Sequence, residues 1–136
     1  MKTKTNIPLI TTDNTVSLHD TVFTVFDVET TGLSAESNRM TEIGIVKMRG
    51  GEIIDEYETL MNPGEFVPPY ITQLTGITNE MVHKKPPFEE LAQGILDFIK
   101  GGDTVFPVLG GHNVRFDYSF LNASLLRAGY NKLDYP

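Results

Sequence analysis

The stretch TVFTVFDVETTGL, residues 21–33, decides how this chain folds. Its first eight residues are almost all β-branched or aromatic, which predicts a strand, and Thr30-Thr31-Gly32 ends that strand. Successive residues of a strand point to opposite faces of the sheet. Asp27 and Glu29 are therefore expected on one face, with Val28 on the other.

Two carboxylates on one face repel each other unless a positive group lies between them. A divalent cation meets that need, since Mg²⁺ is usually held by one or two carboxylates together with phosphate oxygens. The alternative is a strand end that simply enters solvent, where acidic residues are common. Asp27 and Glu29 alone do not decide between the two readings.

Composition narrows the class of protein. The chain has 136 residues, 11 Lys and Arg against 18 Asp and Glu, a net charge of −7 and no Cys. The length suits one domain, and the lack of Cys excludes a disulfide framework and a thiolate zinc site. The acidic balance argues against a sequence-independent clamp on duplex nucleic acid, but not against a site that reaches phosphate through metal ions.

The polar residues 1–20 are expected to form a flexible leader, followed by one domain over 21–136. The leader's short apolar patch, Ile7–Ile10, falls below the length of a secretory signal or a membrane span. A soluble, cytoplasmic protein without a membrane partner is the expectation.

The remaining pattern predicts an α/β fold with a mixed sheet. Gly50-Gly51 supplies the positive φ angles of a tight hairpin turn. A hairpin followed by a strand–helix crossover gives antiparallel and parallel pairs in one sheet. The expected elements are strands at 40–48, 52–61 and 104–109, short helical turns within 67–85, a helix at 88–100, and a helix that contains 116–128 and closes at Gly129.

A second group of polar residues lies in GGHNVRFD, residues 110–117. Asn113 is a candidate N-cap, and Asp117 falls in the first turn of the helix that follows. The helix dipole favours a negative charge there even without a function. Together with Asp27 and Glu29, however, Asp117 would bring a third carboxylate to the same strand edge.

Five blocks of this sequence resemble the DnaQ-like, or DEDDh, 3′-to-5′ exonucleases, a family that includes the proofreading epsilon subunit of bacterial DNA polymerase III. The resemblance covers residues 21–130, and the blocks follow the family's order and spacing. They are FDVETTGL (26–33), EIGIV (42–46), NPG (62–64), LTGIT (74–78) and HNVRFDYSFLN (112–122). Five blocks in register form a far more specific signal than any one of them.

The resemblance implies an RNase H-like fold and metal-dependent hydrolysis at a nucleic-acid 3′ end, with two divalent ions, Mg²⁺ or Mn²⁺. By position, Asp27, Glu29 and Asp117 would be the catalytic metal ligands. The family positions that contact the substrate fall on Thr30, Gly32, Leu33, Thr75, Asn113 and Phe116. Thr75 stands where many members have His. The implied partners are a single-stranded or frayed DNA 3′ end, with RNA also open, and a DNA polymerase subunit.

The family's third motif, which supplies a further Asp ligand and a His general base, is not found before the chain ends at Pro136. None of His19, His83 and His112 is a convincing substitute. The expectation is an RNase H-like domain without its last strand and C-terminal helices, at most weakly active and able to self-associate through an exposed edge strand. A catalytically inactive relative that binds a polymerase or nucleic acid, and an RNA-directed exonuclease, are the alternatives.

Overall fold

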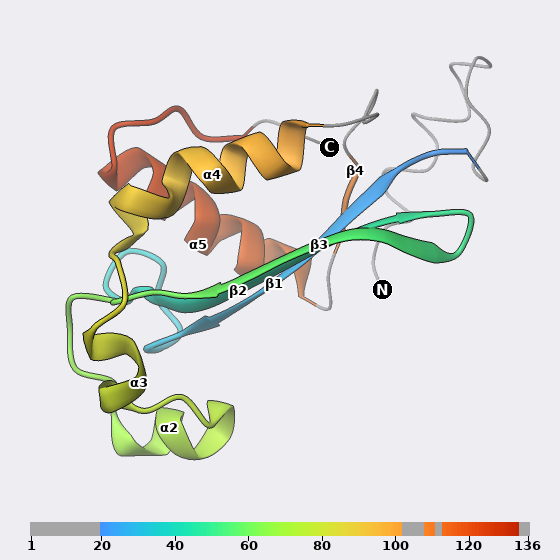
Figure 1. The fold of residues 1–136 in the computed structure, drawn as a ribbon. Helices are drawn as coiled ribbons and strands as arrows, with labels where there is room; N and C mark the ends of the chain where they lie inside the picture. The colour runs from blue at the N-terminus through green and yellow to red at the C-terminus, as the bar shows by residue number, and fades with distance from the viewer. Residues whose placement is uncertain (1–19, 102–107, 111–112, 134–136) are drawn as a thin grey trace.

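Four strands form one mixed sheet in the computed structural model, which describes residues 20–101, 108–110 and 113–133 (Figure 1). They are β1 (Phe23–Thr30), β2 (Met40–Arg49), β3 (Glu52–Leu60) and β4 (Val108–Gly110), in the spatial order β3-β2-β1-β4. The β1–β2 and β2–β3 pairs are antiparallel, and β1 and β4 are parallel. This arrangement confirms the predicted mixed sheet.

The first strand is displaced from its expected position. β1 continues to Thr30 because its pairing with β2 continues to the Thr30–Met40 pair. Asp27 and Glu29 therefore lie within β1, where each is paired with a residue of β2. The hairpin turn is as predicted, with φ angles of 60° at Gly50 and 80° at Gly51. The expected start of β4, residues 104–107, lies outside the described residues.

The helices agree closely with the sequence pattern. They are α2 (Pro69–Thr75), α3 (Asn79–His83), α4 (Phe88–Lys100) and α5 (Val114–Arg127). The dipole of α4 is complemented by Glu89 and Glu90 in its first turn and Lys100 in its last. None of the helices in the described part of the chain is long and apolar enough to cross a bilayer.

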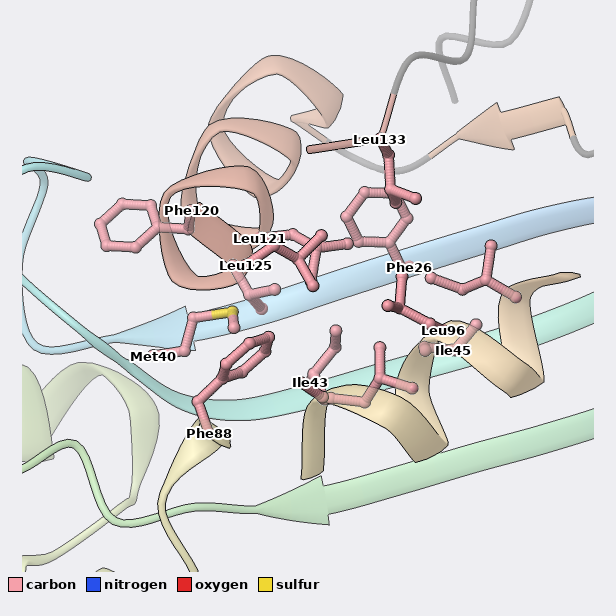
Figure 2. Close-up of a cluster of buried hydrophobic side chains, with 14 of the residues drawn as sticks. Phe26, Met40, Ile43, Ile45, Phe88, Leu96, Phe120, Leu121, Leu125 and Leu133 are labelled. Atoms are coloured by element: carbon pink, nitrogen blue, oxygen red, sulfur yellow. The ribbon is translucent and has the colours of Figure 1, made fainter. Parts of the chain in front are cut away.

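The main core lies between the sheet and the helices α4 and α5, which cover one of its faces (Figure 1). Both strands and helices contribute fully buried apolar side chains (Figure 2). The largest are Phe26, Ile43, Ile45, Met61, Ile95, Ile99, Phe120, Leu121 and Leu125. Leu96 of α4 is also buried, whereas Leu91 of the same helix is only partly buried against the core.

A second, smaller core joins α2 and α3. Its buried side chains are Val67, Ile71, Ile77 and Val82, with Leu60 packed against them. Asn79, the first residue of α3, ties that helix to the segment before α2. Its side chain accepts from the Val67 N–H at 2.8 Å and donates to the Val67 carbonyl at 2.9 Å. In Figure 1, α2 and α3 lie beyond the carboxyl end of β1, away from α4 and α5.

Phe26→Ala is predicted to destabilise the domain by about 3–5 kcal/mol, because a fully buried ring is lost and a cavity remains. Phe66→Ala, a change at a side chain that is 69% exposed, should cost less than about 0.5 kcal/mol. Urea unfolding of both variants followed by circular dichroism checks the difference. Equal midpoints would contradict the assignment of Phe26 to the core.

Candidate active site

Asp27 and Glu29 project from β1 on the face opposite the main core. Phe26 and Val28, which alternate with them, are 1% and 5% exposed and face α4 and α5. Asp27 is exposed and Glu29 is half-buried. The prediction that the two carboxylates share a face is thus confirmed, and its cause is the twofold period of the strand.

Asp117 reaches the same strand from the first turn of α5. β4 pairs only with Phe23–Val25 of β1, so the later residues of β1 have a free edge on that side within the described chain. The backbone N–H of Val28 donates to the Asp117 carboxylate at this edge. The short length of β4 and the position of α5 therefore place the third predicted carboxylate beside the other two.

The Asp117 carboxylate is only partly satisfied. The residue is 2% exposed, and its Oδ2 finds no hydrogen-bond partner among the described residues. Burial, then the nearby Asp27 and to a lesser degree Glu29, raise the pKa of Asp117 to about 7, against the lowering effect of the Val28 N–H. A buried oxygen that repels its neighbours needs a proton or a cation.

The neighbouring strands enlarge this acidic face. Asp27 lies opposite Gly44 of β2, which in turn lies opposite Glu58 of β3. A Cβ placed on Gly44 would meet the Glu58 carboxylate at 3.9 Å. Glu29 lies directly opposite Glu42.

Burial and the neighbouring negative charges raise the pKa values of both Glu29 and Glu42. Burial and Asp27 raise the pKa of Glu29, and burial, Glu58, Glu29 and Asp27 raise the pKa of Glu42. The sequence reading missed Glu42 and Glu58. Counting residues back from the Gly50-Gly51 turn would have paired β2 with β3 and indicated that Glu42 and Glu58 lie near Asp27 and Glu29.

The predicted substrate residues fall into two groups. Thr30, the last residue of β1, and Gly32, in the turn after it, are buried, and the Thr30 hydroxyl donates to the Gly32 carbonyl at 2.6 Å. Leu33, in the same turn, is 87% exposed. Asn113 is exposed, and Phe116 lies half-buried with its ring 4.8 Å from that of Phe120. These five residues flank the carboxylates on the β1 turn and the start of α5.

Thr75 belongs to a separate element, the last residue of α2. Its hydroxyl donates to the Ile71 carbonyl at 2.9 Å and accepts from the Ile77 N–H at 3.1 Å. The hydroxyl is thus engaged in ending the helix. Asn113 occupies the N-cap position of α5, as expected, but its side chain makes no capping hydrogen bond.

Of the three histidines, His83 lies exposed at the end of α3, and His19 and His112 lie outside the described residues. A separate cavity of about 220 Å³ has Arg39, Phe88, Glu89 and Arg127 among its lining residues and none of the three carboxylates. The described part of the candidate site thus consists of carboxylates with turn and helix-start residues around them.

Comparison with known proteins identifies the family. Residues 24–135 match the family model described as Exonuclease. This chain belongs to the exonuclease family. The family predicted from the sequence is therefore confirmed.

The relatives of this chain include PolC-type DNA polymerases III. It is 41% identical over 123 residues to DNA polymerase III PolC-type of Caldanaerobacter subterraneus subsp. tengcongensis, covering 90% of this chain and 8% of the relative. It is 37% identical over 131 residues to the PolC-type polymerase of Streptococcus suis, covering 96% of this chain and 9% of the relative. The chain spans less than a tenth of these curated relatives.

The fold agrees with that of a solved exonuclease. Exonuclease I of E. coli in complex with a dT13 oligonucleotide superposes with a TM-score of 0.71 at 21% identity, over 83% of this chain and 25% of that one. The agreement confirms the RNase H-like fold.

Exonucleases of this family generally use divalent metal ions, and the donor set of this domain fits such ions. Carboxylate oxygens are the ligands that Mg²⁺ and Mn²⁺ prefer, and the unpartnered Asp117 Oδ2 is available as a donor. Within residues 20–101, 108–110 and 113–133, no three His, Asp or Glu side chains are gathered into a ready-made metal site. The carboxylates therefore fit a divalent ion because they offer oxygen ligands and because their negative charges repel one another. They do not form a complete coordination shell in the described residues.

Asp117→Asn is predicted to stabilise the domain in EDTA at alkaline pH. The folded-state pKa of Asp117, about 7, lies above its ordinary value of 3.8, so the folded protein binds more protons between these values and loses stability as the pH rises through them. Asn carries no charge. Its advantage should be close to zero at pH 4 and on the order of 1 kcal/mol at pH 8.

Thermal or urea unfolding at the two pH values measures this difference. The matched control is Asp97→Asn, a change at an exposed carboxylate of α4, which should give the same shift at both pH values. An Asp117→Asn variant that is less stable than the wild type at pH 8 would disprove the repulsion at this site.

Proposed function

We propose that this domain hydrolyses phosphodiester bonds at the 3′ end of an unpaired DNA strand, in the manner of a proofreading or repair exonuclease. The observation that carries the proposal is the Asp117 carboxylate, buried and partly unpartnered, facing Asp27 and Glu29 in a chain of the exonuclease family. The fold alone does not require three repelling carboxylates at one strand edge. The relatives are PolC-type DNA polymerases, which favours DNA.

Asp27, Glu29 and Asp117 would hold two divalent ions, Mg²⁺ or Mn²⁺. Such ions supply a water of lowered pKa and neutralise charge on the attacking and leaving oxygens. The domain's own residues prepare that site. β1 fixes the directions of Asp27 and Glu29, and the Val28 N–H holds Asp117 in place at the strand edge.

The residues around the carboxylates would position the terminal nucleotide. Leu33, 87% exposed on a turn whose backbone is fixed by the Thr30–Gly32 hydrogen bond, can pack against a base face without reading its identity. The exposed Asn113 side chain, which makes no capping bond, can donate to or accept from a sugar or phosphate. A Cβ on Gly32 would lie 2.5 Å from Asn38 Oδ1, so a larger residue there would have to displace the Asn38 side chain, which accepts from the Ser34 N–H.

Asp27→Ala in the complete gene product is predicted to lower metal-dependent release of nucleotides from a 3′-labelled oligonucleotide by at least about a hundredfold, because a metal ligand is lost. Unfolding should change little, since Asp27 is exposed. Asp97→Ala, which removes an exposed carboxylate of α4, serves as the control and should keep full activity. Turnover of Asp27→Ala near that of the wild type would disprove the assignment of Asp27 as a metal ligand.

A further inference from the structure

The loop between β1 and β2, residues 31–39, is closed at its base by its own two ends. The Thr31 N–H donates to the Arg39 carbonyl at 2.9 Å, and the Arg39 N–H donates to the Thr31 hydroxyl at 3.0 Å. Inside the loop, the Asn38 N–H donates to the Ser34 carbonyl at 2.7 Å, and the Asn38 side chain accepts from the Ser34 N–H at 3.0 Å. These bonds make the loop a compact unit, so its position depends on how the unit is attached to the domain.

Two hydrogen bonds from distant segments attach this loop within the described part of the chain. The Thr31 hydroxyl donates to the carboxylate of Glu65, which follows β3. The Arg127 Nη1, at the end of α5, donates to the Ala35 carbonyl at 3.0 Å. Glu65 thus holds the base of the loop, whereas Arg127 holds its middle.

The Arg127 side chain is oriented by its own helix and lies among charged groups. Its Nη2 donates at 3.4 Å to the hydroxyl of Ser124, a buried residue one turn earlier on α5. Burial, and then the neighbouring Arg39, lowers the pKa of Arg127, and Glu89 and Glu65 act in the opposite direction. Because an arginine stays protonated in proteins, its bond to the loop is a charge-assisted one.

A cavity separates part of this loop from α5. Its volume is about 220 Å³, and Arg39, Phe88 and Arg127 are among its lining residues. A space of this size removes side-chain contacts that would otherwise hold the end of the loop against the helix. Within the described residues, the loop is therefore linked to α5 chiefly by the Arg127 bond, together with the partial packing of Ala35 on the main core.

The helix that carries this anchor also carries a proposed metal ligand. Asp117 lies in the first turn of α5 and Arg127 is its last residue. At 1.5 Å per residue, about 15 Å separates them along the helix axis. The hydrogen-bonded helix keeps that separation constant, so a loop bound to Arg127 has a fixed position relative to Asp117. Leu33, 87% exposed, lies on this loop.

We propose that Arg127 is a positioning residue for the terminal nucleotide. By donating to Ala35 it sets the position of residues 31–39, and with them Leu33, relative to the carboxylates. The inference rests on the proposed function and deepens it, because it assigns the placement of the terminal base to a side chain at the opposite end of α5 from Asp117. The role belongs to substrate binding and not to the chemical step, so its loss affects KM and not kcat.

Amide hydrogen exchange in EDTA, followed by NMR, tests the anchor without substrate or metal. In Arg127→Ala, the Ser37 and Asn38 amides, which are hydrogen-bonded inside the loop, should exchange about tenfold faster than in the wild type, because the loop opens more often. Amides of β1 should keep their wild-type rates. Lys132→Ala, which removes another exposed cation near the end of α5, is the matched control and should leave the loop unchanged.

Steady-state kinetics of the complete gene product, on an oligodeoxynucleotide with an unpaired 3′ end, tests the link to Leu33. Arg127→Ala is expected to raise KM about fivefold and to leave kcat within about twofold, whereas a merely structural loss of folded enzyme lowers kcat and leaves KM unchanged. Leu33→Ala should raise KM as well, and the two effects should not add in the double variant, because both act through one contact. Arg127→Lys, which keeps a donor, should recover part of the loss, and Lys132→Ala should keep the wild-type KM.

Three results would each overturn the inference, whether or not hydrolysis is observed. They are wild-type exchange of the loop in Arg127→Ala, equally accelerated exchange in β1, and additive KM effects of Arg127→Ala and Leu33→Ala. Faster exchange confined to the loop, with no metal-dependent hydrolysis by the wild-type complete gene product, overturns the proposed function instead and leaves Arg127 as the anchor of the loop.

Discussion

The twofold alternation of side chains along β1 is the constraint on which the rest of the molecule depends. Phe26 and Val28 enter the core under α4 and α5, and Asp27 and Glu29 leave on the other face. β2 and β4 pair with this strand on its two sides. A slip of one residue would put carboxylates into the core and a phenyl ring at the acidic face, so the register that buries the core also places the chemistry.

The acidic face works against folding. Asp27 and Glu29 project from one face of β1, Asp117 lies at the edge of that strand, and Glu42 lies opposite Glu29. Burial, and then repulsion from neighbouring carboxylates, disfavours the charged forms of Glu29, Glu42 and Asp117. The main core supplies the opposing stability through side chains that are fully buried, such as Ile43, Ile95 and Phe120. Functional sites commonly keep such local destabilisation where the surrounding packing can offset it.

Much of this could be predicted from the sequence, because local rules governed it. The period of β1 gave the shared face of Asp27 and Glu29, and the apolar spacing between the prolines at 86–87 and the glycines at 101–102 gave the bounds of α4. Asp117 was predicted as a neighbour of these carboxylates. Its bond to the Val28 N–H could not be, because it depends on how soon β4 stops pairing with β1.

Other features depended on contacts between distant segments. Lys47 occupies a core-facing position of β2, where alternation calls for an apolar residue. Its Nζ donates to the Gly101 carbonyl at 2.7 Å and lies 4.9 Å from the centre of the Phe98 ring. The positive charge therefore lies at the carboxyl end of α4, where the helix dipole favours it. The turn of Thr31 toward Glu65 and the convergence of Arg39 and Arg127 at one cavity likewise require the folded chain.

The separate small core of Val67, Ile71, Ile77 and Val82 has an evolutionary consequence. Because α2 and α3 are held together by their own buried side chains, residues on their outer surface can change without disturbing the packing behind Asp27 and Glu29. Sequence variation on the outer surface of α2 and α3 is therefore compatible with an unchanged β1 and an unchanged main core.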